Sequence, residues 1–82
     1  MYYVYLLRCS DDTLYCGYTD NIEKRLKVHN SGKGAKYTRN RLPVCLVYSE
    51  EHDNKSDALK REFQIKKLTR AEKIELVEKY HK

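Results

Sequence analysis

Two short apolar runs near the start of the chain predict a β-hairpin. The runs occupy residues 2–9 and 13–19, and both are rich in tyrosine and leucine. Ser10-Asp11-Asp12 between them consists of residues typical of turns. The pattern therefore predicts two antiparallel strands joined by a three-residue loop.

The register of this hairpin determines which side chains share a face. If Cys9 pairs with Thr13 across the loop, Tyr5 faces Gly17 and Tyr15 lies diagonally beside Tyr5. Tyr5 and Tyr15 have an even spacing, so alternation along the strands puts both phenols on one face. Two adjacent phenols could act together on a proton or a phosphate group.

A helical pattern and a polar loop follow the hairpin. Asp20 and Glu23 resemble a capping box at the start of a helix over residues 21–30. Gly32 suits the end of this helix, since glycine adopts the left-handed conformation found there. Residues 32–41 are polar and predict a loop.

One more strand and two more helices complete the pattern. Residues 44–48 are almost continuously apolar, which predicts a strand in a central position, and residues 50–55 predict a loop. A second helix starts at Ser56 or a neighbouring Asp or Asn and reaches about Leu68. Thr69 with Glu72 predicts a third helix to about Tyr80, whose inward face is formed by Ile74, Val77 and Tyr80.

The order ββαβαα predicts the α+β class, with a three-stranded, largely antiparallel sheet flanked by helices. At this length we expect one domain over residues 1–82. No stretch is long enough to cross a membrane, and the first residues form a strand pattern and not a signal peptide. Three cysteines without paired spacing indicate reduced thiols, so we expect a cytoplasmic protein and no zinc site.

The chain is basic. It has 17 Lys and Arg against 12 Asp and Glu, giving a formal charge of +5. Such a charge favours polyanionic partners such as nucleic acid. An ordinary soluble surface that happens to be positive explains it equally well.

Arg25 and His29 lie four residues apart on the first predicted helix and therefore project from the same face. Arg25 could hold a phosphate through two hydrogen bonds, and His29 could accept a proton near neutral pH. Taken alone, both are more often ordinary residues of a polar helix face.

Glu62 falls on or beside the apolar stripe of the second predicted helix, next to Ala58, Leu59 and Ile65. A carboxylate in this position needs a partner, because burying an unpaired charge is costly. The partner could be a divalent metal ion, with water and phosphate oxygens completing the shell, or a basic side chain such as Lys66 or Arg25.

The loop after the first helix is a candidate backbone clamp for nucleic acid. Its glycines allow close approach to a phosphate, and an aromatic ring could stack on a base. A solvated basic loop is the alternative, and the spacing does not match a P-loop. The candidate contact residues are Lys33, Lys36, Tyr37, Arg39 and Arg41.

These positions together resemble the GIY-YIG nucleases, and in particular the small stand-alone members. Tyr3-Val4-Tyr5 and Tyr15-Cys16-Gly17 correspond to the two strand motifs that name the family, and Arg25, His29 and Glu62 match in order. The resemblance covers essentially the whole chain. Tyr3, Val4 and Cys16 replace the Gly, Ile and Ile of the motifs. Ile74 stands near the place where some members have an asparagine.

The resemblance implies a metal-dependent phosphodiesterase. Glu62 would hold Mg²⁺ or Mn²⁺, and Arg25 would grip the phosphate. Tyr5 would take a proton from the attacking water with Tyr15 as its positioning partner, although the two roles could be exchanged. A phenol with a pKa near ~10 would need the metal and Arg25 nearby, or a proton relay to His29, to act at neutral pH.

The implied substrate is nucleic acid, DNA more than RNA, cleaved with little sequence specificity in repair or processing. The loop cations would contact its backbone. We expect a monomer to which a protein partner could supply specificity. Two alternatives remain open: a nucleic-acid-binding module that keeps the fold without turnover, and a protein-interaction domain in which these residues serve stability.

Overall fold

The computed structural model describes residues 1–81. It confirms the α+β class and the order ββαβαα, with one short additional helix, α2, inside the segment predicted as a loop. The elements are β1 Tyr2–Arg8, β2 Leu14–Thr19, α1 Ile22–Asn30, α2 Lys36–Arg39, β3 Cys45–His52, α3 Lys55–Lys66 and α4 Arg70–Tyr80.

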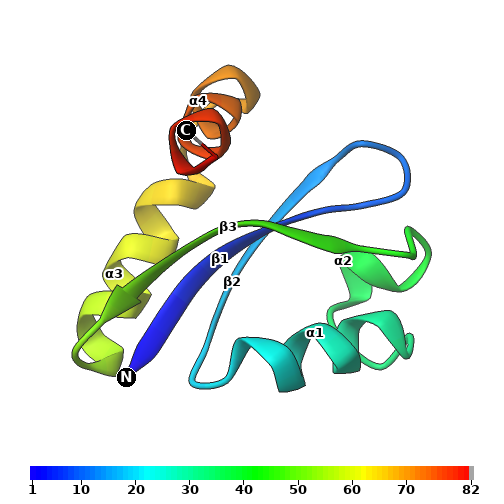
Figure 1. Cartoon of the computed structure of the whole chain (residues 1–82), viewed down its shortest axis with the longest axis horizontal. Helices are drawn as coiled ribbons and strands as arrows, with labels where there is room; N and C mark the ends of the chain where they lie inside the picture. Colours follow the sequence, from blue (N-terminus) through cyan, green and yellow to red (C-terminus); the bar gives the residue numbers. More distant parts are fainter. Residues whose placement is uncertain (82) are drawn as a thin grey trace.

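The sheet is antiparallel throughout and has the strand order β2-β1-β3 (Figure 1). The hairpin register is as predicted: Tyr5 pairs with Gly17, and the backbone N–H of Cys9 donates to the carbonyl of Thr13 at 2.9 Å. The central strand is β1, so the prediction of a central third strand was wrong. β3 is apolar on both sides: Leu46 packs against one cluster, and a bulge opposite Leu6 and Leu7 places both Val47 and Tyr48 against the other.

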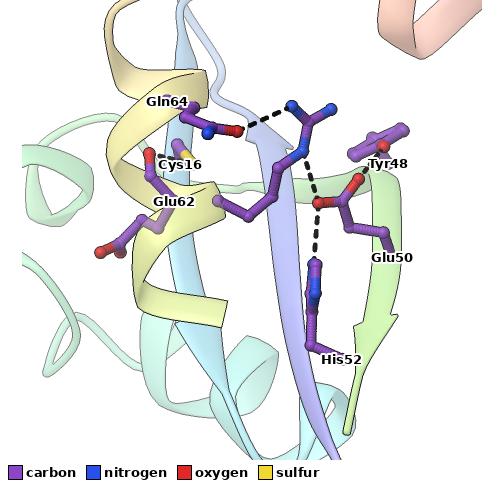
Figure 2. A network of polar contacts seen from close by, with 7 residues as sticks. Cys16, Tyr48, Glu50, His52, Glu62 and Gln64 are labelled. Carbon is purple, nitrogen blue, oxygen red and sulfur yellow. Dashed lines mark hydrogen bonds and ion pairs between the residues drawn. The ribbon is translucent and has the colours of Figure 1, made fainter. Parts of the chain in front are cut away.

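β3 is also longer than its apolar run, and the predicted loop over residues 50–55 was wrong over its first half. The strand continues through Glu50 to His52, where it pairs with Val4 to Tyr2 of β1. Tyr48, His52 and Arg61 all donate hydrogen bonds to the Glu50 carboxylate (Figure 2). A charge satisfied in this way can lie half-buried between β3 and α3.

Each face of the sheet has its own hydrophobic cluster. Helices α3 and α4 cover one face, while α1 and α2 lie at the other (Figure 1). Val4, Leu6, Cys16, Val47, Ala58 and Ile65 form the buried cluster under α3. The second cluster consists of Tyr5, Leu7, Cys9 and Val44, with Tyr15, Leu26, Leu42 and Leu46 packed against it. The phenols of the hairpin therefore project from the α1 face.

Side-chain caps set the starts of α1, α3 and α4. Asn21, and not the predicted Asp20, caps α1, because its side chain accepts from the backbone N–H of Lys24 at 3.1 Å. Asn54 caps α3 in the same way. The capping box of Thr69 and Glu72 at α4 is confirmed, with both hydrogen bonds present.

Helix α4 packs on the sheet through Leu76 and Val77. The predicted inward residues Ile74 and Tyr80 are 36% and 49% exposed, although the Tyr80 ring contacts Tyr48 edge-on. The inward face was therefore wrong in part, since α4 meets the sheet near its edge strand and buries a narrower stripe. Within residues 1–81, no helix has the length and apolar character needed to cross a membrane.

Candidate active site

Tyr5 and Tyr15 lie side by side on the α1 face, and Gly17 makes room for them. A Cβ atom added to Gly17 would lie 2.5 Å from the Tyr5 hydroxyl oxygen and 3.2 Å from a ring carbon of Tyr15. Only glycine permits this approach, since contacts below 3.0 Å are essentially never seen for real Cβ atoms. The glycine of the second strand motif is thus explained by the position of the first tyrosine.

His29 is completely buried and contacts Tyr5 directly. Its Nε2 atom lies 3.0 Å from the Tyr5 hydroxyl oxygen, and its Nδ1 atom lies 2.9 Å from the hydroxyl oxygen of Thr38, which is also completely buried. Gly34 packs against the imidazole so closely that a Cβ atom there would lie 2.5 Å from Nδ1. His29 is therefore not an ordinary residue of a polar helix face.

Thr38 is the site residue that the sequence pattern missed. It lies in α2 between exposed residues, and no apolar periodicity marks its position as buried. Its burial depends on α2 folding back over His29, which is a tertiary contact. The sequence feature that could have indicated a buried Thr38 is its small hydroxyl side chain within a run rich in Lys and Arg.

Arg25 lies half-buried one turn before His29 and acts on the same group. Burial raises the pKa of Tyr5 to about 12, although a hydrogen bond from Arg25 and its positive charge act in the opposite direction. Burial and the charge of Arg25 lower the pKa of His29 below its ordinary value. At neutral pH Tyr5 is therefore a neutral phenol, and His29 is a neutral imidazole able to accept a proton.

Tyr37 and Arg41 form an internal stack beside these residues. The Tyr37 ring stacks on Tyr15 with centroids 5.9 Å apart and an interplanar angle of 26°. The guanidinium carbon of Arg41 lies 4.2 Å from the Tyr37 centroid, and its Nε atom lies 3.0 Å from a carboxylate oxygen of Asp11. Arg41 and Tyr37 thus hold Tyr15 in place, while the other loop cations are exposed: Lys33, Lys36 and Arg39.

Glu62 lies on α3, which covers the opposite face of the sheet from Tyr5. Its side chain is 16% exposed, and the Lys66 ammonium lies 3.7 Å from its carboxylate. Its backbone carbonyl accepts a hydrogen bond of 3.9 Å from the thiol of Cys16, on edge strand β2. One of the two partners considered for Glu62, a basic side chain, is therefore present. Figure 2 shows its carboxylate on the opposite side of α3 from Glu50.

The structure joins Tyr5, Tyr15, Arg25 and His29 into one group. No hydrogen bond or ion pair among residues 1–81 links Glu62 to that group, and Glu62 approaches it only through β2. Within the same residues, no three His, Cys, Asp or Glu side chains cluster closely enough to hold a metal ion together. A single carboxylate beside an exchangeable ammonium suits a hard cation that keeps most of its water, such as Mg²⁺.

Comparison with known proteins gives a consistent result. The model of a family described as the GIY-YIG catalytic domain matches residues 1–75. A UPF0213 protein of Syntrophus aciditrophicus is 64% identical over 76 residues, covering 92% of this chain and 87% of the relative. A UPF0213 protein of Clostridium perfringens is 58% identical over 77 residues, covering 94% and 83%.

Two solution NMR structures are also similar. A UPF0213 protein of Bacillus halodurans superimposes with a TM-score of 0.61 at 46% identity, covering 95% of this chain and 84% of that one. A protein of E. faecalis superimposes with a TM-score of 0.65 at 45% identity, covering 98% and 85%.

Proposed function

Because this chain belongs to the GIY-YIG catalytic domain family, which has a nuclease fold, we propose that it hydrolyses phosphodiester bonds in nucleic acid with the help of a divalent metal ion. The observation that carries the proposal is the contact between the Tyr5 hydroxyl and the buried Nε2 atom of His29, beside Arg25. A phenol next to a neutral proton acceptor can take a proton from an attacking water, and a guanidinium can stabilise the negative charge of the phosphate.

In this proposal Tyr5 and His29 act in sequence on the attacking water. Tyr5 is protonated at neutral pH and cannot serve as a phenolate base. It can accept a proton from water while its own proton passes to Nε2 of His29. The water oxygen then forms a bond to phosphorus, the bond from phosphorus to the leaving oxygen breaks, and the leaving oxygen takes a proton from solvent water. Tyr15 positions Tyr5, and Arg25 binds the phosphate and balances its developing charge.

Glu62 is the residue that would hold Mg²⁺ or Mn²⁺, with Lys66 giving up its place beside the carboxylate. When bound, such an ion supplies charge stabilisation to the phosphate and to the leaving oxygen. A partly exposed carboxylate is a hard oxygen ligand, and it suits these ions.

The substrate proposed is DNA, bound mainly through its backbone and with little sequence specificity, in repair or processing. The support is the formal charge of +5 together with the exposed cations Lys33, Lys36 and Arg39 near the Tyr5 group. Phosphate contacts of this kind contribute affinity without choosing bases. Free cysteines among the described residues are consistent with a reducing compartment such as the cytoplasm.

The test is cleavage of labelled single-stranded, duplex and branched DNA and RNA with Mg²⁺ or Mn²⁺. Wild type is compared with Glu62→Gln, Arg25→Gln and, as a matched control, the exposed Glu78→Gln on α4. We expect product from wild type and the control only, and none when the metal is chelated. Salt-dependent binding without product would favour the binding module instead. Loss of thermal stability in Glu62→Gln, without any binding, would favour the protein-interaction domain.

A further inference from the structure

Thr38 makes two hydrogen bonds through one hydroxyl group. Its oxygen lies 3.0 Å from the carbonyl oxygen of Ala35 and 2.9 Å from Nδ1 of His29. A carbonyl oxygen only accepts, so the single hydroxyl hydrogen of Thr38 is used by Ala35. With the Thr38 hydrogen directed to Ala35, the contact with His29 is donated by the imidazole, which places a hydrogen on Nδ1.

The protonation of Nδ1 determines the state of the other ring nitrogen. A neutral imidazole has one N–H, so Nε2 of His29 carries only a lone pair and accepts from the Tyr5 hydroxyl. The neighbourhood of Tyr5 supports the same direction. The Arg25 guanidinium lowers the pKa of Tyr5 and has no acceptor atom, so it cannot receive the hydroxyl hydrogen of Tyr5.

We propose that Thr38 is a positioning residue that holds His29 as the Nδ1–H tautomer, so that Nε2 is free to receive the proton of Tyr5. The inference rests on the proposed nuclease function for its use in catalysis, while the tautomer itself is a property of the free protein. It assigns a role to a residue of α2 that does not contact the phenols.

The arrangement lets the proton move without rearranging the site. When water transfers a proton to the Tyr5 oxygen, the original Tyr5 proton passes to Nε2, and His29 becomes an imidazolium with both nitrogens protonated. Nδ1–H still donates to Thr38, because the Thr38 oxygen accepts in both states. With the opposite tautomer, Nε2 would carry a hydrogen and have no lone pair for the proton.

The groups around His29 are all compatible with this cycle. Tyr5 and Tyr15 face the ring from the two strands, Thr38 faces it from α2, and Arg25 lies on the same helix. Arg25 is the one permanent charge among them, and it favours the neutral imidazole before reaction. The proton accepted by Nε2 therefore passes readily back to the Tyr5 oxygen once the product leaves, and Tyr5 releases its other proton to water.

The first test is the tautomer of His29 in the wild-type full chain, read from long-range ¹H–¹⁵N NMR correlations at pH 7.5. His52→Gln and His81→Gln identify the His29 signals by elimination. We expect a pyrrole-type shift for Nδ1 and a pyridine-type shift for Nε2. The reverse pattern, or an equal mixture, overturns the inference whether or not the protein cleaves nucleic acid.

The second test compares Thr38→Val with Thr38→Ser. Valine has a similar shape without the hydroxyl, and serine keeps it, so we expect the wild-type tautomer and activity to be retained only by Thr38→Ser. We expect Thr38→Val to lower kcat at least about tenfold, which is part of the roughly 10²–10⁴-fold that general acid–base groups contribute. KM should change little, and the acid limb of the pH profile should shift.

The two tests separate the inference from the proposed function. A wild-type Nδ1–H tautomer with no cleavage under any metal condition contradicts the nuclease function and leaves the tautomer established. Cleavage by Thr38→Val at the wild-type rate, with the tautomer mixed, overturns the catalytic role of Thr38. If Thr38→Val does not fold, the wild-type tautomer still decides the question.

Discussion

Gly17→Ala is the substitution for which the structure predicts the clearest effect. The new Cβ atom would lie 2.5 Å from the Tyr5 hydroxyl oxygen and 2.7 Å from Cζ of the same ring. Reaching an ordinary contact of 3.4 Å requires a shift of about 0.9 Å in a densely packed region. Such a shift of the Tyr5 ring breaks its 3.0 Å hydrogen bond to His29.

The cost follows from two contributions. Overpacking of a buried site costs about 1–3 kcal/mol, and leaving His29 without its buried partner costs about 1–3 kcal/mol more. Replacing glycine by alanine returns about 0.4–1 kcal/mol through the unfolded chain. We therefore expect the free energy of unfolding to fall by about 3 kcal/mol, and Tm to fall by roughly 12–24 °C for a domain of this size.

The assay is urea and thermal unfolding followed by circular dichroism, together with the cleavage reaction. Tyr5→Phe removes the atom that would be closest to the added Cβ, so it is the partner for a double-mutant cycle. The double variant should be at least about 1 kcal/mol more stable than the sum of the two single effects predicts. Strict additivity, or a Gly17→Ala protein within about 0.5 kcal/mol of wild type, would refute the reasoning.

Further predictions concern two glycines and His29 near this site, and Glu50 away from it. Gly34→Ala should abolish cleavage and cost about 1–3 kcal/mol, because its Cβ would lie 2.8 Å from the Cα atom of His29. Gly32 has a φ of 81°, and a Cβ atom there would make only an ordinary contact of 3.9 Å with Leu42. Gly32→Ala should therefore cost about 1 kcal/mol in urea unfolding and leave turnover unchanged. Equal turnover in the Gly34 and Gly32 variants would contradict this pair of predictions. Because the pKa of His29 is lowered in the folded protein, His29 of the unfolded chain takes up a proton at higher pH than His29 of the folded chain. The free energy of unfolding should therefore fall as pH drops below about 6.5. The same fall in His29→Gln would contradict the assignment to His29. Glu50→Gln should lower the free energy of unfolding by about 1–3 kcal/mol, because it weakens three hydrogen bonds. Cleavage should not change, since these bonds are remote from the Tyr5 group. An unchanged urea midpoint would contradict this prediction.

The parts of the fold that the sequence predicted are those fixed by local chemistry. The hairpin register follows from the turn residues and from alternation along two strands, and Tyr5 meets Gly17 as expected. The capping box of Thr69 and Glu72 is a contact between residues three apart. The position of β3 was mispredicted because a continuous apolar run does not distinguish a central strand from an edge strand that contains a bulge.

The candidate site shows the same division between local and tertiary information. Side-chain alternation was sufficient to bring Tyr5 and Tyr15 together, and helical spacing was sufficient to align Arg25 with His29. The burial of His29 was not predictable, because it depends on α2 and on Gly34 folding against its ring. The role of Thr38 depends on the same fold-back.

Edge strand β2 connects the two halves of the candidate site. The Tyr15 side chain and the open side of Gly17 face Tyr5. The Cys16 side chain between them points to the other face and contacts α3, the helix that carries Glu62. A slip of one residue in β2 would exchange these faces and place a larger side chain under the Tyr5 ring. Gly17 is the one residue of β2 small enough for that position, and so it fixes the register as well as the tyrosine geometry. The glycine thereby determines on which side of the sheet edge each half of the site lies.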